Sequence, residues 1–275
     1  MSVIKTNIAA QYAQDALAAN QKSMSTVMQQ LATGNRINAA KDDAAGLSIG
    51  QNMTSQVRGL NQAVRNATDG INLLQTADGA LVEASSMLQR MRELAIQSSN
   101  GSNSPTQRSY LNTEFSSLQL EISRIGDNTM WNNSNVFASV AGTNSLVFQA
   151  GANAGQTISV ALSGMNATAL AVDASKAEIL SFGSAQSAIS TIDAAIETVN
   201  SARGRMGATM NQLSYSADNM TNISTNIAAS RSSIMDIDYA TAASQLSRSQ
   251  IIQQAATAML AQANQMPQNV MALLK

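Results

Sequence analysis

The sequence predicts a mainly α-helical protein: an elongated rod of long helices in coiled-coil-like packing, with a small β-hairpin patch. Three observations predict this fold. Apolar residues recur at alternating spacings of three and four along most of the 275 residues. Aromatic residues make up 3% of the chain, while Ala, Ser, Asn and Gln are abundant, which suits close helix packing better than a thick core. Proline occurs at two positions, Pro105 and Pro267, so long uninterrupted helices are possible.

The first predicted helix carries a heptad seam. Its apolar residues recur every seven positions: Val3, Ala10, Leu17, Met24 and Leu31, with Met28 in the intermediate position. Gly34 and Asn35 both tolerate positive φ and predict the end of this helix. The charge cluster 41–43 (Lys-Asp-Asp) that follows is interpreted as a solvated connector.

The longest periodic segment runs from about Leu47 to Ser99. As one helix it would be about 75 Å long at roughly 1.5 Å per residue, and it must find packing partners along that length. After a stop at 100–101 (Asn-Gly), residues 104–107 (Ser-Pro-Thr-Gln) predict a capping box with proline at the first helical position. The helix that starts there ends near Gly126 and should form an antiparallel hairpin with the long helix.

From Asp127 to Leu162 the apolar period changes to two, which predicts strands. The alternating residues fall in two runs separated by a turn-rich link: Leu146, Phe148 and Ala150, then Ile158, Val160 and Leu162. We expect hairpins here that cap one end of the helical body. The segment from Gly164 to Phe182 has little periodic signal and is predicted to be a loop.

Helical periodicity returns from Ala185 to about Arg231, and a last helix begins near Tyr239 after a second polar connector. The order of elements is therefore nearly a palindrome, and the two terminal helices should pack on each other. This predicts an inner terminal-helix domain of residues 1–43 plus 236–275. Residues 44–235 would form a middle helical domain, with the β patch at about 127–182.

Residues 249–274 contain no charged side chain, but they carry two apolar stripes at near-helical spacing. The stripes are Ile252, Ala255, Met259 and Met266, and Ala256, Leu260 and Ala263. A membrane span would not tolerate the many interleaved amides, because an unpaired buried amide costs free energy. We therefore expect this end to be buried among helices of an assembly. The candidate assembly interface is Leu17, Met24, Leu31, Ile252, Met259, Leu260 and Met266.

The residue types required for most catalysis are missing. Cysteine and histidine are both absent, so the chain has no thiolate nucleophile and no imidazole for acid–base or metal chemistry. No phosphate-binding loop or calcium loop is complete. We expect no enzyme activity, no cofactor and no metal. With a net charge of -1 and dispersed Lys and Arg, we also expect no nucleic-acid or membrane partner. The N-terminus lacks the apolar core of a signal peptide.

Four segments resemble the bacterial flagellin family and together cover nearly the whole chain. They are LATGNRINAAKDDAAGLSIG (31–50), RMRELAIQSSNG (90–101), FQAGANAGQTISV (148–160) and the C-terminal stretch 233–275. Many flagellins carry large variable outer domains after the β segment. Here only residues 164–182 occupy that place, so the chain looks like a minimal flagellin without outer domains.

The resemblance implies a structural subunit that polymerises into the helical filament of the bacterial flagellum, the propeller for motility. It implies terminal helices that are disordered before assembly and line the filament channel afterwards. Export would use the flagellar type III apparatus and place the chain in an extracellular filament. The implied partners are further copies of the chain, a secretion chaperone, a filament cap protein and the hook–filament junction protein. Two alternatives remain open, a hook–filament junction protein and a secreted helical adhesin.

The family also has a surface that is read by Toll-like receptor 5 of animal hosts. By resemblance this surface maps to Gln89, Arg90, Leu94, Gln97 and Glu114. Arg90 and Leu94 are four residues apart on one helix and should share a face, with Glu114 contributed by the next helix. The same face is expected to pack against a neighbouring subunit in a filament.

Overall fold

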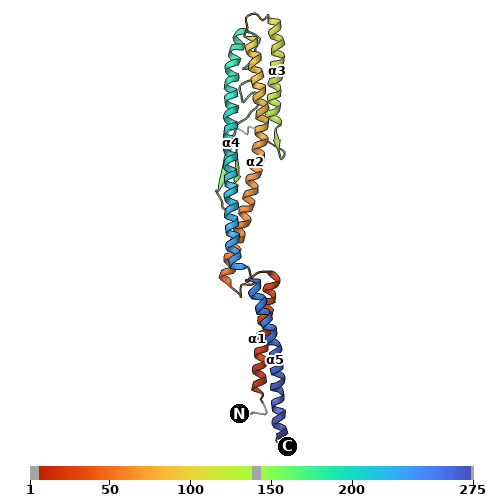
Figure 1. Cartoon of the computed structure of the whole chain (residues 1–275). Helices are drawn as coiled ribbons and strands as arrows, with labels where there is room; N and C mark the ends of the chain where they lie inside the picture. Colours follow the sequence, from red (N-terminus) through yellow and green to blue (C-terminus); the bar gives the residue numbers. More distant parts are fainter. Residues whose placement is uncertain (1–5, 138–143, 274–275) are drawn as a thin grey trace. The chain divides into compact units, whose positions relative to one another are not determined.

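A computed structural model describes the backbone of residues 6–137 and 144–273 and the side chains of residues 6–137 and 145–265. The helices in these ranges are α1 (Ile8–Thr33), α2 (Ala44–Ser98), α3 (Pro105–Asn128), α4 (Phe182–Met235) and α5 (Tyr239–Leu273) (Figure 1). The strands are β1 (Met130–Trp131), β2 (Ser134–Asn135), β3 (Asn144–Gln149) and β4 (Thr157–Leu162). The predicted mainly helical fold with a small β-hairpin patch is confirmed.

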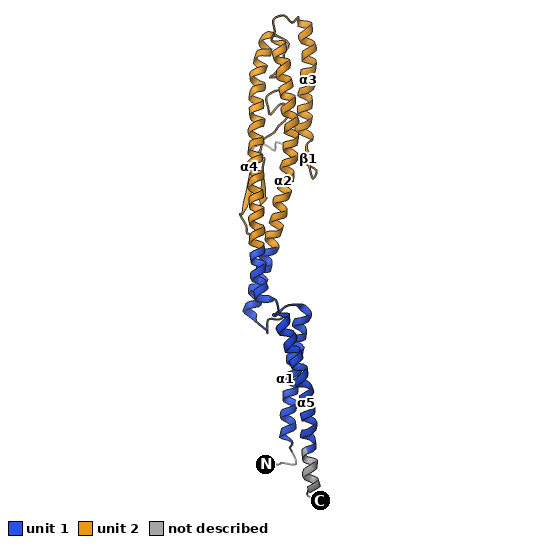
Figure 2. Ribbon diagram, viewed as in Figure 1, with its two compact units in different colours: residues 1–57, 225–275 blue, residues 58–224 orange. Residues whose placement is uncertain are grey.

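The chain divides into two compact units (Figure 2). One contains residues 1–57 and 225–275, and the other contains residues 58–224. The division therefore falls inside α2 and α4. The domain boundary predicted from the sequence lies at the connectors instead, with residues 1–43 plus 236–275 as an inner domain. That boundary stays a prediction.

The helix ends follow local chemistry. The side chain of Asn7 accepts a hydrogen bond from the N–H of Ala10 (3.1 Å) and caps α1. Gly34 ends α1 in the left-handed conformation (φ 74°) that glycine adopts without a steric penalty. The capping box predicted at the start of α3 is confirmed, because the Ser104 and Gln107 side chains each accept from the other residue's backbone N–H.

In the first unit, α1 and α5 pack against each other, as predicted for the terminal helices, and the structure shows that they run antiparallel. The Asn7 Nδ2 atom donates to the Ala263 carbonyl oxygen and the Asn20 Nδ2 atom donates to the Ser249 carbonyl oxygen, both at 2.8 Å. At the other end of the pair, the Tyr239 hydroxyl donates to the Leu31 carbonyl oxygen (3.3 Å). The amide side chains therefore bond across the helix interface.

The seam on α1 differs from the prediction at one position. Val27 is buried (5% exposed), whereas Met28, which was expected to fill the intermediate position, is 49% exposed. Adjacent residues of a helix point about 100° apart, so only one of the two can face α5. Val27 is the residue that does so, three positions after Met24.

The two connectors meet each other. Asn35 and Asp236 form an antiparallel bridge, in which the Arg36 N–H donates to the Met235 carbonyl oxygen (2.7 Å). The charge cluster at residues 41–43 is exposed, as expected of a solvated connector. Its carboxylates also shape the chain, since Asp43 Oδ1 accepts from the Gly46 N–H (2.9 Å) at the start of α2.

In the second unit, α2 and α4 run antiparallel, and α3 lies beside them (Figure 1). Polar pairs follow the α2–α4 contact: Asp78 with Arg203 (2.8 Å), and Arg92 with Asp193 (2.6 Å). The core of this unit is mostly aliphatic, and Phe115 is the aromatic residue among its fully buried helix side chains. Its largest fully buried side chains on the helices are Leu74, Leu81, Leu88, Met91, Leu94, Phe115, Ile122, Ile192, Met206 and Leu213.

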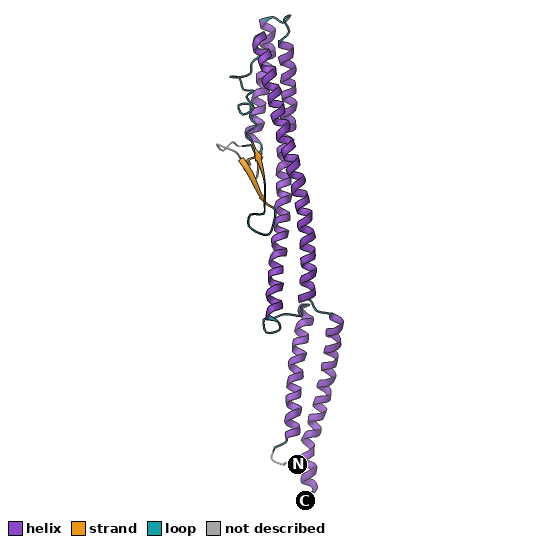
Figure 3. Cartoon of the chain, turned by 90° about the vertical axis from the view of Figure 1, so that its left-hand side faces the viewer, coloured by secondary structure: helices purple, strands orange, loops and turns teal. Residues whose placement is uncertain are grey.

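The strands form two antiparallel hairpins. The predicted alternation is confirmed in β3 and β4, where Leu146 pairs with Val160 and Phe148 pairs with Ile158. The expectation that the hairpins cap one end of the helical body was wrong. The β3–β4 hairpin lies along the sides of the helices (Figure 3), and Phe148 packs so closely on Gly70 of α2 that a Cβ there would lie 2.9 Å from the ring. Glycine in α2 makes this lateral approach possible.

Residues 163–181 contain no helix or strand, which confirms the predicted loop. This segment, called the strap below, is nevertheless well packed. Six of its apolar side chains are buried: Met165, Ala167, Leu170, Val172, Ala177 and Ile179. The strap is thus a core element of the second unit.

Candidate assembly and recognition surfaces

The two apolar stripes of α5 have different environments. In the stripe of Ala256, Leu260 and Ala263 all three side chains are partly buried, and the Ala263 carbonyl accepts the hydrogen bond from Asn7 of α1. This stripe faces α1. The other stripe is exposed: Ile252 is 45% exposed, Met259 is 68% exposed, and Ala255 between them is exposed as well. The exposed stripe has no partner within the described residues of the chain.

The predicted assembly residues divide between these environments. Leu17, Met24 and Leu31 are half-buried on the side of α1 that carries Asn20 and Val27, so they belong to the α1–α5 contact. Leu260 belongs to the same contact from the α5 side. Ile252 and Met259 lie on the exposed stripe. Met266 lies outside the described side chains.

Sequence reasoning missed several exposed apolar side chains of this helix pair. Ile8 is 52% exposed, Tyr12 is 73% exposed and Ile251 is 66% exposed. The signal that could have identified the first two is their spacing of four, which defines a second apolar stripe on α1 beside the heptad seam. Soluble monomers rarely keep large contiguous apolar surface exposed, so such surface usually marks an interaction site.

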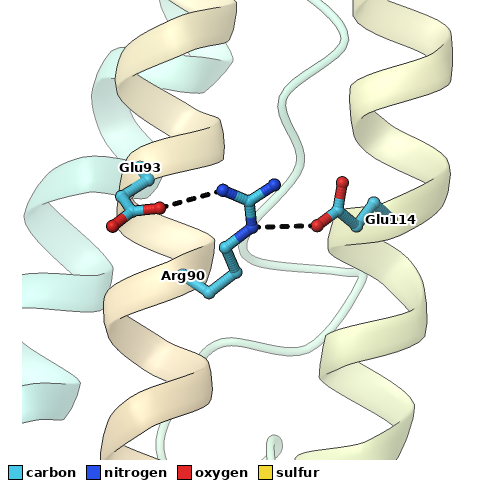
Figure 4. Close-up of polar contacts among 3 residues, drawn as sticks. All are labelled: Arg90, Glu93 and Glu114. Carbon is cyan, nitrogen blue, oxygen red and sulfur yellow. Dashed lines mark hydrogen bonds and ion pairs between the residues drawn. The ribbon is translucent and has the colours of Figure 1, made fainter.

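The predicted recognition residues surround a small ion-pair cluster on α2 and α3 (Figure 4). Arg90 Nε lies 2.9 Å from Glu114 Oε1, and Arg90 Nη1 lies 2.9 Å from Glu93 Oε2. These hydrogen bonds, first to Glu114 and then to Glu93, raise the pKa of the Arg90 guanidinium. All three side chains remain about half exposed or more, so the pairs fix geometry and add little stability.

The other predicted members differ in accessibility. Gln89 and Gln97 are exposed on α2. Leu94 has no exposed surface, because its side chain is in the core of the second unit. A partner that docks on this face would therefore contact Arg90 and the two glutamines directly. Leu94 would affect such a partner only indirectly, through its packing in the core.

Reactive centres are not evident in the part of the chain that the structure describes. Among those residues, no group of three or more Asp or Glu side chains is placed to hold a metal ion. Among the same residues, no helix has the length and apolar character needed to cross a bilayer.

Comparisons with known proteins agree with this description. Residues 4–142 match the family model of the bacterial flagellin N-terminal helical region, and residues 189–274 match that of the C-terminal helical region. A flagellin of Halalkalibacterium halodurans is 42% identical over 273 residues, covering 99% of this chain and 100% of that protein. The flagellar filament 33 kDa core protein of Treponema phagedenis is 39% identical, again over 99% of this chain and 100% of the relative.

The structure of a putative flagellar hook-associated protein from Vibrio parahaemolyticus superposes with a TM-score of 0.58. The superposed region covers 71% of this chain and 100% of the Vibrio protein. Because the two sequences are 17% identical, the similarity supports the fold alone.

Fold and surfaces together define a structural protein of paired terminal helices, with apolar surface left available for other copies. The family matches are more specific: the chain belongs to the bacterial flagellin family.

Proposed function

We propose that this chain is the structural subunit of a bacterial flagellar filament. The observation that carries the proposal is the exposed α5 stripe of Ile252, Ala255 and Met259. A helix that carries no charged residue from Ser249 onward, packs one apolar stripe on α1 and leaves a second stripe exposed is suited to pack against neighbouring copies. The name of the Treponema phagedenis relative, a flagellar filament core protein, supports the same function.

The energetics favour assembly through this surface. Burial of one Ile or Met side chain stabilises a contact by about 1.5–3 kcal/mol. The gain is repeated in every subunit, and Ile8, Tyr12 and Ile251 add further apolar surface. A head-to-tail contact that does not close on itself generates an open helical polymer, which is the geometry of a filament.

Seeded polymerisation tests the proposal. Purified chain is added to short filament fragments, and growth is followed by light scattering and electron microscopy. We expect the intact chain to elongate the seeds, and a chain truncated at Ser233 to stay soluble. The point variant Met259→Glu should also fail, because it places a charge on the exposed stripe.

The matched control is Met259→Leu, which conserves volume and apolar character and should elongate normally. An intact chain that stays monomeric, with protease-resistant helical ends, would refute the filament subunit and point to a secreted adhesin. If the chain is found on cells only in trace amounts at filament bases, that result would favour the alternative that it is a hook–filament junction protein.

The remaining roles follow from the filament proposal. The chain would leave the cell through the flagellar type III apparatus, escorted by a secretion chaperone that wraps the C-terminal segment. A cap protein at the filament tip and the hook–filament junction protein would be further partners, and the filament would serve as the propeller for motility. A strain that lacks the type III apparatus should retain the chain inside the cell; its normal appearance outside would refute this route.

The surface around the Arg90–Glu114 pair is proposed to be recognised by Toll-like receptor 5. Arg90 and Glu114 lie side by side and remain accessible, and Gln89 and Gln97 flank them. We expect Arg90→Ala to weaken receptor activation by folded monomer in a reporter assay. Arg124→Ala removes an exposed arginine of α3 that pairs with Glu121 and serves as the control. Equal activation by both variants would exclude this surface.

A further inference from the structure

The turn between α2 and α3 contains the one Asn-Gly pair of the sequence, Asn100 and Gly101. Both residues are exposed, and they lie just after α2 ends at Ser98. An asparagine side-chain amide can be attacked by the backbone nitrogen of the next residue, and glycine favours this attack because it has no Cβ to crowd the nitrogen. The hydrogen bonds of this turn act on the atoms that would take part.

The attacking atom would be the backbone nitrogen of Gly101. Among the residues that the structure describes, its N–H group donates no hydrogen bond, so the nitrogen is available. The carbonyl oxygen of the same peptide group, that of Asn100, accepts from Arg108 Nη2 (3.1 Å) and from the Asn103 N–H (3.2 Å). Peptide resonance would place much of the charge of a deprotonated nitrogen on this oxygen, so the guanidinium favours loss of the proton.

The atom under attack would be the side-chain carbon of Asn100. The Asn100 Oδ1 atom accepts a hydrogen bond from the Ser102 N–H (3.2 Å), which folds the side chain back along the turn. As the nitrogen adds to Cγ, negative charge develops on Oδ1. A donor that is already in place at this oxygen stabilises that charge.

The neighbouring asparagine, Asn103, has the opposite environment. The N–H group that follows it, that of Ser104, donates to Gln107 Oε1 in the capping box (2.8 Å). The Asn103 Nδ2 atom donates to the Gln97 carbonyl oxygen (2.6 Å). Both the nitrogen that would attack and the amide that would leave are therefore engaged, and Asn103 serves as an internal control.

We propose that Asn100 is a site at which the folded chain modifies itself, with Arg108 promoting the step. The Gly101 nitrogen gives up its proton and bonds to Asn100 Cγ, the Cγ–Nδ2 bond breaks, and Nδ2 leaves with that proton as ammonia. The product is a five-membered succinimide. Water opens the ring at either carbonyl and yields aspartate or isoaspartate, without oxidation or reduction.

Both products change the turn. Each adds a negative charge near the C-terminal end of α2, where the helix dipole is already negative. Isoaspartate also lengthens the main chain by one methylene group and converts the carbonyl group that Arg108 contacts into a free carboxylate. The reaction would loosen the connection between α2 and α3 as a chain ages. It depends on the second unit alone, so it holds whether or not the chain forms a filament.

The test incubates the purified full-length chain and a synthetic peptide of residues 95–109 under the same mildly alkaline conditions. Peptide mass spectrometry follows loss of the amide at Asn100 and Asn103. Isoaspartate is detected separately by methyl transfer from S-adenosylmethionine with an isoaspartyl carboxyl methyltransferase. We expect Asn100 to convert faster in the folded chain than in the peptide, and Asn103 to remain intact in the folded chain.

Variants separate the contributions to the rate. Arg108→Gln should slow conversion by about tenfold, the effect of losing one hydrogen bond from a charged donor. Arg108→Lys keeps the positive charge and should recover part of the rate. Gly101→Ala should also slow the reaction, and it fits the fold, since a Cβ there meets nothing within 4 Å and φ lies outside the left-handed region. Arg124→Gln changes a distant exposed arginine of α3 and should leave the rate unchanged.

Three results would overturn the proposal. One is a peptide that reacts faster than the folded chain, because the fold would then protect Asn100. Another is an Arg108→Gln chain that reacts as fast as the wild type. The third is an Arg108→Lys chain that is as slow as Arg108→Gln, because the charge would then play no part. Circular dichroism of each variant verifies that the comparison is made between folded chains.

Discussion

At the scale of single residues, Gly126 shows how one missing side chain positions an element. It lies in the last turn of α3, where the strap crosses. A Cβ at this position would lie 2.7 Å from the backbone nitrogen of Asn166 and 2.9 Å from the carbonyl carbon of Met165. Both neighbours are main-chain atoms, which cannot rotate away as a flexible side chain could.

Gly126→Ala should therefore destabilise the second unit, by about 1–3 kcal/mol for an overpacked contact. Gly204→Ala in α4 is the matched control, because a Cβ there meets nothing within 4 Å. The control should stabilise the helix by about 0.5–1 kcal/mol. Urea unfolding can be followed by fluorescence of Trp131, the one tryptophan of the sequence. Equal midpoints for the two variants would refute the close contact.

Asp238 gives the start of α5 a pH dependence. Its carboxylate accepts hydrogen bonds from the Thr241 hydroxyl (2.8 Å) and from the N–H groups of Thr241 (3.4 Å) and Ala240 (3.0 Å). These bonds, the hydroxyl first, lower the pKa of Asp238 below its ordinary value. Stabilisation by the carboxylate is thus fully present above the unfolded-state pKa of about 3.9, and it is lost as the pH falls through the folded-state value.

We expect acid to loosen the first turn of α5 in the wild type more than in Asp238→Asn, which keeps a capping oxygen but does not titrate. Hydrogen exchange of residues 239–243, measured from neutral pH to acid and corrected for intrinsic rates, reports the difference. The proposed linkage fails if both chains lose protection in parallel.

At the scale of elements, Gln119 connects α3 to the strap. Its side chain is 5% exposed, and its Nε2 atom donates to the carbonyl oxygens of Val172 (2.8 Å) and Ala177 (2.7 Å). These bonds satisfy backbone groups of a segment that has no helix or sheet partners of its own. One amide thereby allows an irregular segment to be buried.

Gln119→Leu removes both donors and leaves two carbonyl oxygens without this partner. The expected cost is about 1–3 kcal/mol for each group left unsatisfied. Gln75→Leu, at an exposed position of α2, is the control and should be nearly neutral. Hydrogen exchange should show that loss of protection begins in the strap. A Gln119→Leu chain as stable as the control would show that the carbonyl groups find other partners.

At the scale of the whole molecule, the two units differ in how much they bury. Within α1 and α5, the described side chains that are buried are Ala10, Val27, Ala242 and Ser249, and none of these is large. The second unit instead contains a continuous core of large side chains on three helices and the strap. Local stability follows the number of buried apolar contacts, so the terminal helices should open far more readily.

Hydrogen exchange on the free chain should therefore show fast exchange throughout α1 and α5 and slow exchange in residues 199–213 of α4. In filaments, α1 and α5 should become protected, because neighbouring copies would cover the exposed stripe. Terminal helices that exchange as slowly as α4 in the free chain would contradict the idea that assembly completes their burial.

The sequence by itself determined the helices, their approximate ends, the α3 capping box, the β3–β4 pairing and the family. The structural features depend on local periodicity and capping chemistry, which neighbouring residues encode directly, whereas the family was identified by the resemblance of four segments. The packing of α1 against α5 was also predictable, because both helices carry apolar seams, whereas their antiparallel direction came from the structure.

Only the tertiary structure decided which residues those elements bury. It placed Val27 rather than Met28 on the seam, buried Leu94 in the core, and laid the β3–β4 hairpin along α2. It also packed the strap against α3 through Gln119 and Gly126, although the sequence of the strap has no periodic apolar pattern. Each outcome depends on which side of an element meets a distant partner. A periodic sequence can present more than one apolar face, and three-dimensional packing selects the face that is used.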